Sequence, residues 1–567
     1  MKPTNLIQLF RRASFIAPCF VLATALVACG SLASKPGSAS ETPSEQDALS
    51  TATPIKHLVV IYGENVSFDH YFATYPAATN PPGEPSFTAA PGTPKVNGLS
   101  GALLDNNPNL NPANGDGAAN PFRLDRSQAW TADQNHSYTA EQMAGDHGAL
   151  DLFPKYTGMA SHGGSGTFAT KGLVLGYFDG NTVTALWNYA QHFAMSDNAW
   201  TTAYGPSTPG ALEVVAGQTN GYQIIKTTKQ PSTVAKPTYY IHDGAHGLTM
   251  IADVDPAYDV CSNAGDNGMI DAKNIGDLLN SHNVTWGGFM AGFDLQTTNP
   301  NGTTGCRRST TPTQVPTSSL DYIPHHNWFQ YFRSTSNPQH TRPSSTDAIG
   351  YSVEADGKTP EPANHQYDTD DFFAAVKAGN FPSVSFLKAP AAQDAHAGYS
   401  DPLDEQAFVT RVVNFLMQQP DWKNTAVVVT YDDSDGWYDH QYMKPVNSSR
   451  AAVDQLGGNG VCGNGTPMAG VKGEPVNGRC GPGTRIPFLV ISPWAKSNYV
   501  DHAFIDQSSV TRFIEDNWLG GERLGGGAFD ASAGDMRGLF DFDGHGALPV
   551  LYLDPQQGTP LSVAPSA

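Results

Sequence analysis

Short apolar runs recur along the chain and alternate with segments whose apolar residues are spaced as in helices. The runs are rich in β-branched and aromatic residues, which is typical of buried strands. Between them, Phe408, Val412 and Phe415 recur three and four positions apart, which predicts a helix. We predict strands at residues 57–62, 284–289, 383–387, 425–431 and 486–492, and helices at residues 184–194, 274–281, 369–378, 404–419 and 505–517.

This alternation predicts an α/β fold with a mainly parallel sheet that is covered on both faces. Neither a repeat nor a second linker interrupts the body, so we predict one domain over residues 54–555 and a tail at residues 556–567. Long loops connect the elements, and loops of such length usually shape a site or are disordered. They are rich in Gly, Pro, Asn and Thr and lie at residues 76–130, 218–250, 295–320 and 441–484.

The N-terminal segment has the pattern of an export signal. A basic start precedes an apolar stretch at residues 15–28, which is too short for a convincing membrane span. The end of this stretch resembles a bacterial lipobox, which predicts a signal peptide at residues 1–29 and a lipid anchor on Cys29. The alternative is an ordinary signal-peptide cleavage site near Ala28. Residues 30–53 are predicted to be a flexible tether. We expect an exported lipoprotein on the periplasmic side of the cell envelope, with the outer membrane and secretion as alternatives.

The cysteines support export. Two of the six, Cys19 and Cys29, belong to the predicted signal, and four remain in the body. An even number in an exported protein predicts two disulfides, although free thiols are the alternative. Three pairings are possible, and sequence order favours Cys261 with Cys306 and Cys462 with Cys480.

The charge balance argues against one class of partner. The chain has 32 Lys and Arg against 53 Asp and Glu, a formal net charge of −21. Phosphate contacts to nucleic acid need clustered Lys and Arg, so we expect no nucleic-acid partner.

Paired oxygen donors follow two of the predicted strands. Glu64 and Asn65 come after the strand at residues 57–62, and Asp432 and Asp433 come after the strand at residues 425–431. Carboxylate and amide oxygens are hard ligands for divalent cations, and a cation would relieve the repulsion between adjacent carboxylates. The alternative is two solvated polar turns.

A hydroxyl and several imidazoles are further candidates. Ser207 precedes a helical segment that starts near Ala211, and a hydroxyl at a helix start is either a nucleophile or an N-cap. Lone histidines are usually structural, so a histidine site requires that the fold bring several together. The candidates are His136, His325, His326 and His396.

The order of these motifs resembles one family. Residues 64–72 match its opening E-N-x-S-F-D-H-Y-F, residues 197–209 its D-N…G-P-[ST]-x-P, and residues 430–440 its T-Y-D-E-x-G-G-x-x-D-H. An R-x-P…S-P pattern at residues 485–493 and an S…F-I-E pattern at residues 509–515 follow. Together they resemble the bacterial phosphoesterase family, which contains phospholipases C and acid phosphatases and belongs to the alkaline-phosphatase-like superfamily.

This resemblance implies a three-layer α/β/α sandwich with a mainly parallel central sheet and long loop insertions, as in alkaline phosphatase. It also implies a hydrolase of phosphoric esters, closest to the acid phosphatase branch, that uses one divalent metal cation and a phosphoserine intermediate. The metal ligands implied are Glu64, Asn65, Ser207, Asp432 and Asp433. Ser207 would be the nucleophile, and His136, His325, His326 and His396 would surround the phosphoryl group.

The chain departs from the family pattern beside the site. Gly210 and Ala211 stand where Asn and Arg are common, and Asp433, Ser434 and Asp435 replace Glu, His and Gly. These changes affect the expected substrate more than the reaction. The substrate is expected to be a phosphomonoester, with a phospholipid cleaved by phospholipase C activity as one alternative and a catalytically impaired ester-binding lipoprotein as another.

Overall fold

The computed structural model describes residues 50–161, 163–226, 239–263, 266–544 and 549–565. These residues fall within one unit, Glu45–Ala567. The predicted signal peptide with its Cys29, and the tether up to residue 49, lie outside the described residues. Within the part of the chain that is described, no helix is long and apolar enough to cross a membrane.

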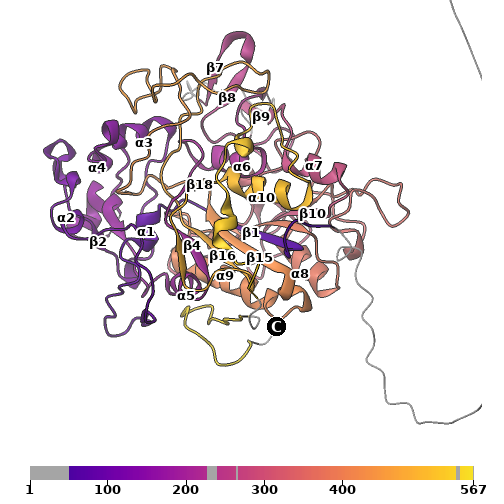
Figure 1. The fold of residues 1–567 in the computed structure, drawn as a ribbon, viewed down its shortest axis with the longest axis horizontal. Coiled ribbons are helices and arrows are strands. Elements are labelled where there is room, and N and C mark those ends of the chain that lie inside the picture. Colours follow the sequence, from indigo (N-terminus) through magenta and orange to yellow (C-terminus); the bar gives the residue numbers. More distant parts are fainter. Residues whose placement is uncertain (1–49, 162, 227–238, 264–265, 545–548, 566–567) are drawn as a thin grey trace, which may run out of the picture. The chain divides into compact units, whose positions relative to one another are not determined.

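An eight-stranded sheet forms the centre of the fold (Figure 1). Seven strands run in one direction, and β16 is antiparallel to both of its neighbours, β15 and β4. The mainly parallel sheet expected from the sequence is therefore confirmed. In spatial order the strands are β13 (Gln366–Tyr367), β10 (Trp286–Met290), β14 (Val384–Lys388), β1 (His57–Gly63), β15 (Thr425–Tyr431), β16 (Phe488–Ile491), β4 (Ala194–Ser196) and β17 (Tyr499–Asp501).

The five predicted strands are all present. Those predicted at residues 284–289 and 486–492 are shorter at their starts, because β10 begins at Trp286 and β16 at Phe488. The three sheet strands without a prediction, β13, β4 and β17, are two or three residues long. Such strands are too short to give a recognisable apolar run.

Side chains alternate along β1 between two cores. Val59 and Ile61 pack in one core with residues of three helices, whereas Leu58 and Val60 pack in a second core with residues of three others. The first three helices are α5 (Thr184–His192), α8 (Thr369–Lys377) and α9 (Pro402–Leu416), and the other three are α6 (Ser207–Ala216), α7 (Ile275–Ser281) and α10 (Ser508–Trp518). Successive side chains of a strand point to opposite faces of its sheet, so helices cover both faces. The predicted three-layer α/β/α arrangement is confirmed.

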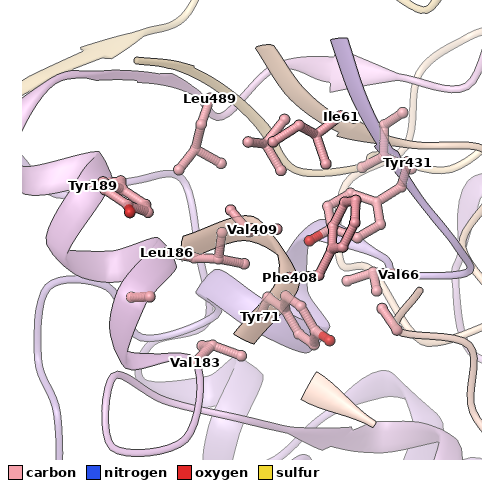
Figure 2. Packing of buried hydrophobic residues seen from close by; sticks show 14 of the residues in the cluster. Ile61, Val66, Tyr71, Val183, Leu186, Tyr189, Phe408, Val409, Tyr431 and Leu489 are labelled. Atoms are coloured by element: carbon pink, nitrogen blue, oxygen red, sulfur yellow. The ribbon is translucent and has the colours of Figure 1, made fainter. Parts of the chain in front are cut away.

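Figure 2 shows the first of these cores. Ile61 of β1 and Leu489 of β16 share it with Leu186 of α5 and Val409 of α9. All four side chains are at most 3% exposed. The apolar stripe read from the sequence of α9 therefore faces the sheet, as its spacing predicted.

The predicted helices are present with small shifts at their ends. α9 starts two residues earlier than predicted, because Pro402 takes its first position and Asp401 accepts hydrogen bonds from the first turn. The helices that cover the sheet are α5 (Thr184–His192), α6 (Ser207–Ala216), α7 (Ile275–Ser281), α8 (Thr369–Lys377), α9 (Pro402–Leu416) and α10 (Ser508–Trp518).

The long insertions contain short elements of their own. Five two-stranded sheets are found outside the central sheet in the described residues. They pair β2 (Phe122–Arg123) with β3 (Gly176–Tyr177), β5 (Ala199–Trp200) with β18 (Ile505–Asp506), β6 (Tyr222–Lys226) with β9 (Asp266–Ile270), β7 (Tyr240–His242) with β8 (Leu248–Met250), and β11 (Ser309–Thr310) with β12 (Ser319–Leu320). The remaining α-helices are α1 (Phe68–Phe72), α2 (Ala102–Asp105), α3 (Tyr138–Gly145) and α4 (Phe153–Tyr156).

Two disulfides hold two of these insertions. Cys261 pairs with Cys306 and Cys462 with Cys480, with Cα–Cα distances of 5.2 and 5.8 Å. The pairing favoured by sequence order is confirmed. The first bridge spans β9, α7 (Ile275–Ser281) and β10 and ties the insertion at residues 295–320 to the segment before β9, whereas the second closes a loop that contains no helix or strand.

The end of the chain packs on α9. Asn414 exchanges side-chain hydrogen bonds with the backbone of Leu553, and Gln406 Nε2 donates to Gln556 O at 3.0 Å. The boundary predicted at residue 555 stays a prediction.

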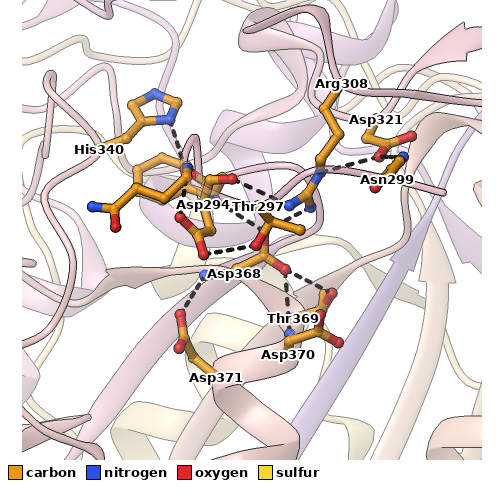
Figure 3. Close-up of polar contacts among 12 residues, drawn as sticks. Asp294, Thr297, Asn299, Arg308, Asp321, His340, Asp368, Thr369, Asp370 and Asp371 are labelled. Atoms are coloured by element: carbon orange, nitrogen blue, oxygen red, sulfur yellow. Dashed lines mark hydrogen bonds and ion pairs between the residues drawn. The ribbon is translucent and has the colours of Figure 1, made fainter. Parts of the chain in front are cut away.

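A buried arginine attaches the insertion at residues 295–320 to the start of α8 (Figure 3). Arg308 is 6% exposed and donates to Asp321 Oδ2 at 3.1 Å and to Asp368 Oδ2 at 2.9 Å. It also donates to the backbone oxygen of Asp294. Asp368 is the N-cap of α8, so one carboxylate serves both the helix and the insertion.

We expect Arg308→Gln to destabilise the fold strongly. It removes the positive charge between two buried carboxylates, and breaking such a pair costs about 3–5 kcal/mol. The control is Arg537→Gln, because Arg537 pairs with Asp535 at the surface, where the loss is about 0–1 kcal/mol. Urea unfolding followed by circular dichroism measures both free energies, and equal losses would contradict this role of Arg308.

Candidate functional site

Three adjacent strands deliver polar side chains to one edge of the sheet. β14, β1 and β15 are parallel neighbours, so their carboxyl ends meet at the same edge. Lys388 is the last residue of β14, and Glu64 and Asp432 directly follow β1 and β15. The backbone N–H of Asn65 donates to Asp432 Oδ1 at 2.9 Å, so the two pairs predicted from the sequence lie together.

Glycines allow close approach at this edge. A Cβ on Gly63 would lie 2.6 Å from the Tyr431 ring, so only glycine lets β1 end beside that side chain. A Cβ on Gly210 would lie 2.1 Å from the backbone oxygen of Asp432. The glycine that departs from the family pattern thus allows α6 to pack against the acidic loop.

Asn65 is held in a defined orientation. Its φ of 63° lies in the left-handed region, which asparagine tolerates better than most residues. Its Nδ2 donates to Asp435 Oδ1 at 3.2 Å, and its Oδ1 lies 3.3 Å from Ser207 Oγ. A carboxylate only accepts hydrogen bonds, so Asp435 fixes the amide nitrogen on its side and directs the amide oxygen to Ser207.

Ser207 is the first residue of α6 and does not cap it. The N-cap is Pro206, without a side-chain hydrogen bond to the helix. The Ser207 hydroxyl instead lies 3.3 Å from Asp433 Oδ2 as well as from Asn65 Oδ1. It therefore sits at the positive end of the helix dipole and between two of the predicted metal ligands.

The four histidines predicted from the sequence converge on the same place. His326 Nδ1 lies 3.0 Å from Glu64 Oε1, and the rings of His325 and His326 are 4.5 Å apart. The His396 ring is 6.4 Å from that of His326 and 5.9 Å from that of His136. His325 and His326 belong to the 3-10 helix η10 (Pro324–His326), and Thr208 Oγ donates to the backbone oxygen of His325.

Burial and neighbouring charges perturb the titration of the site. Burial together with Asp432 raises the pKa of Asp433 well above its usual value. Burial disfavours a charged His136, but Asp433 and Asp435 outweigh it and raise its pKa. The pKa of His326 is lowered by burial and by the neighbouring histidines. The site thus combines excess negative charge with imidazoles of different basicity.

The oxygen donors fit a divalent cation. Glu64 Oε2 and Asp432 Oδ2 are buried and have no hydrogen-bond partner, which is costly for a charged oxygen without an ion. Asn65 and Ser207 add neutral oxygens to these hard donors. Two groups near the site have Asp, Glu or His ligand atoms within 4.8 Å of one another. Among the described residues, one group consists of Glu64, His326 and Asp394, and the other consists of Asp133, His136, His396 and Asp435. Neither group contains Asp432 or Asp433.

Sequence reasoning missed several residues that support the site. Lys388 directly follows the strand predicted at residues 383–387, but a single lysine gives no signal of a partner across the sheet. Asp394 follows β14, and its backbone oxygen accepts from the N–H of Glu64. Glu141 of α3 accepts from Ser434 Oγ at 2.6 Å and from the N–H of Gly205 at 3.2 Å, and burial raises its pKa to about 7. No pattern in the sequence indicated Glu141.

Other residues of the motifs connect the segments around the site through hydrogen bonds and ion pairs. Asp69 Oδ1 accepts from Arg485 at 3.2 Å, and its Oδ2 lies 2.6 Å from His440 Nδ1. Arg485 also donates two hydrogen bonds to Asp439. These contacts join segments that are far apart in the sequence, which explains why the motifs occur together.

A pocket of about 530 Å³ opens beside the site. His136, Pro206, Tyr239 and Asp253 contribute to its walls. Of the candidate site residues, His136 borders this pocket, and so does Pro206, the residue before Ser207.

The sequence profile of the Phosphoesterase family matches residues 55–519, which include every site residue described above. The chain belongs to this family. Family membership agrees with the resemblance predicted from the motifs.

Two phospholipases C and one solved structure match parts of the chain. The hemolytic phospholipase C of Pseudomonas aeruginosa is 23% identical over 501 residues, 88% of this chain and 58% of that protein. The non-hemolytic phospholipase C of Burkholderia pseudomallei is 35% identical over 145 residues, 25% of this chain and 19% of that protein. Among solved structures, murine ectonucleotide pyrophosphatase/phosphodiesterase 5 matches with a TM-score of 0.29 and 10% identity, covering 63% of this chain and 95% of that chain.

We expect Asp435→Asn to lower the affinity for a divalent cation by about 10- to 100-fold, the usual cost of losing a residue that orients a ligand. An amide at residue 435 can donate as well as accept, so it no longer fixes the Asn65 amide. Isothermal titration with Mn²⁺ measures the affinity. The control is Asp133→Asn, because Asp133 also faces His136 but is 54% exposed and makes no described contact with Asn65. Equal affinities in the two variants would contradict the orienting role.

Proposed function

We propose that the protein hydrolyses phosphoric esters, with Ser207 as the nucleophile. The observation that carries the proposal is the Ser207 hydroxyl at a helix start, 3.3 Å from both Asn65 Oδ1 and Asp433 Oδ2. Membership of the Phosphoesterase family supports the same reaction class. In this proposal Glu64, Asn65, Ser207, Asp432 and Asp433 hold one divalent cation.

The bound cation would polarise a phosphoryl oxygen and lower the pKa of the Ser207 hydroxyl. Ser207 Oγ, once its proton has passed to solvent, attacks phosphorus in line and forms a phosphoserine, while the bond from phosphorus to the ester oxygen breaks. His325 or His396 protonates that leaving oxygen. A water molecule then cleaves the phosphoserine, and the same histidine accepts the proton of the water. The other histidines, His136 and His326, bind the equatorial phosphoryl oxygens.

The depth of the site favours a phosphomonoester. Ser207, Glu64 and Asp433 are at most 1% exposed, whereas the side chains of His325 and His136 are 30% and 14% exposed. A terminal phosphoryl group is slim enough to reach buried groups while the alcohol stays near the exposed histidines. This argument supports the acid phosphatase type expected from the sequence.

A phospholipid diester is the second candidate. It rests on the relatives, several of which are phospholipases C. The chain spans little more than half the length of the hemolytic enzyme, so substrate preference does not follow from that likeness.

We also propose that the protein is exported. The two disulfides support this placement, because such bridges persist in oxidising compartments. A lipid anchor at Cys29 on the periplasmic side of the envelope remains part of the proposal.

We expect Ser207→Ala to reduce turnover by about 10³-fold or more with the fold intact, because no other hydroxyl replaces the nucleophile. The control is Ser509→Ala in α10, whose hydroxyl contacts Asp506 instead of the site. Hydrolysis of p-nitrophenyl phosphate measures activity, and circular dichroism checks folding. Activity of Ser207→Ala close to that of the unchanged protein would refute the nucleophile.

We expect a chelator to abolish hydrolysis and a divalent cation to restore it, because the buried carboxylates need the ion. A panel of p-nitrophenyl phosphate, bis-p-nitrophenyl phosphate and phosphatidylcholine vesicles then separates the two substrate classes. Preference for the monoester supports the phosphatase type, and preference for the vesicles supports the phospholipase C type. Hydrolysis of none of them by protein with bound metal would instead indicate an ester-binding protein.

A further inference from the structure

A second group of metal-ligand type lies next to the proposed cation site. Glu64, His326 and Asp394 present ligand atoms within 4.8 Å of one another. His326 Nδ1 lies 3.0 Å from Glu64 Oε1 and 3.9 Å from Asp394 Oδ2. All three residues are at most 2% exposed. Two carboxylates and an imidazole form a donor set that commonly binds a divalent ion.

A lysine from the neighbouring strand reaches this group. Lys388 Nζ donates to Glu64 Oε1, the same oxygen that faces His326. The charges of Asp394 and Asp432 also act on the lysine, which is 1% exposed. Because Lys388 is the last residue of β14 and pairs in register with Met290 of β10, the sheet fixes where its side chain starts.

These contacts divide the two oxygens of Glu64. Oε1 contacts Lys388 and His326, whereas Oε2 is buried without a hydrogen-bond partner. Oε1 is therefore occupied by Lys388 and His326, and Oε2 remains available for an ion at the proposed cation site. Two divalent ions flanking one carboxylate would repel each other, and a single ammonium reduces that repulsion.

We propose that the ammonium group of Lys388 occupies a second cation position, formed by Glu64, His326 and Asp394, and so limits the protein to one divalent ion. The first ion is that of the proposed function, on which this inference rests. Lys388 acts here as a positioning residue, because it holds Glu64 with Oε2 free.

Removal of the ammonium tests the inference. We expect Lys388→Ser to bind one more divalent ion per chain than the unchanged protein, because serine removes the charge and leaves space for the ion. The probes are Mn²⁺ and Zn²⁺, with the metal content measured by mass spectrometry after equilibrium dialysis. Lys388→Arg keeps a cation at this position and should gain no ion. Adding Asp394→Asn to Lys388→Ser should remove the gain, because one of the three ligands is lost.

A second variant keeps the test decisive if Lys388→Ser fails to fold. Asp394→Asn alone should bind as many ions as the unchanged protein, because Asp394 is not one of the five proposed ligands of the ion. Loss of the ion in this variant would overturn the inference, since the three residues would then hold the ion themselves.

The outcomes separate the two proposals. The metal content of the unchanged protein tests the proposed function, and a value of zero refutes the proposed cation site. The difference in metal content between Lys388→Ser and the unchanged protein tests the inference. No gain in a folded Lys388→Ser, or two ions in the unchanged protein, overturns it.

Discussion

Negative charge buried at one edge of the central sheet is the constraint on which the rest of the site depends. Glu64, Asp432 and Asp433 are each at most 1% exposed, and two of them have an oxygen without a partner. Burying carboxylates is costly unless cations or hydrogen bonds compensate. The surrounding features meet this need: an ammonium at Lys388, imidazoles, the positive end of α6 and oxygen donors suited to a divalent ion.

The same constraint explains how distant parts of the chain are joined. Lys388 comes from the strand beside β1, Ser207 from the start of α6, and Asp435 from the loop after β15. Each contacts a polar group from a different segment, so the site forms only when the sheet is complete. Arg485 strengthens this assembly, because it pairs with Asp69 and Asp439 from two of the motif segments. The motifs are therefore parts of one buried network.

Much of the fold was predictable, because its central elements carry strong local signals. β1 and β15 are continuous apolar runs, and α9 has a regular apolar stripe, so their type follows from burial on the sheet. β4 and β17 were not predicted, because strands of three residues are defined by their neighbours. Of the site, the sequence indicated Glu64, Ser207 and the acidic pair after β15, whereas Lys388, Asp394 and Glu141 were missed. Their roles depend on contacts across strands and loops, which leave no local pattern.

The sequence by itself determined the strand and helix types, the oxygen donors at the strand ends and the family to which the chain belongs, because these depend on residue type and spacing. Only the tertiary structure decided which of these oxygen donors lie close together. It showed that Ser207 is not a cap, that Asp435 orients Asn65, and that Lys388 contacts one oxygen of Glu64. The physical reason is that sheet register and helix packing set these distances, and a buried charge takes its role from the groups that surround it.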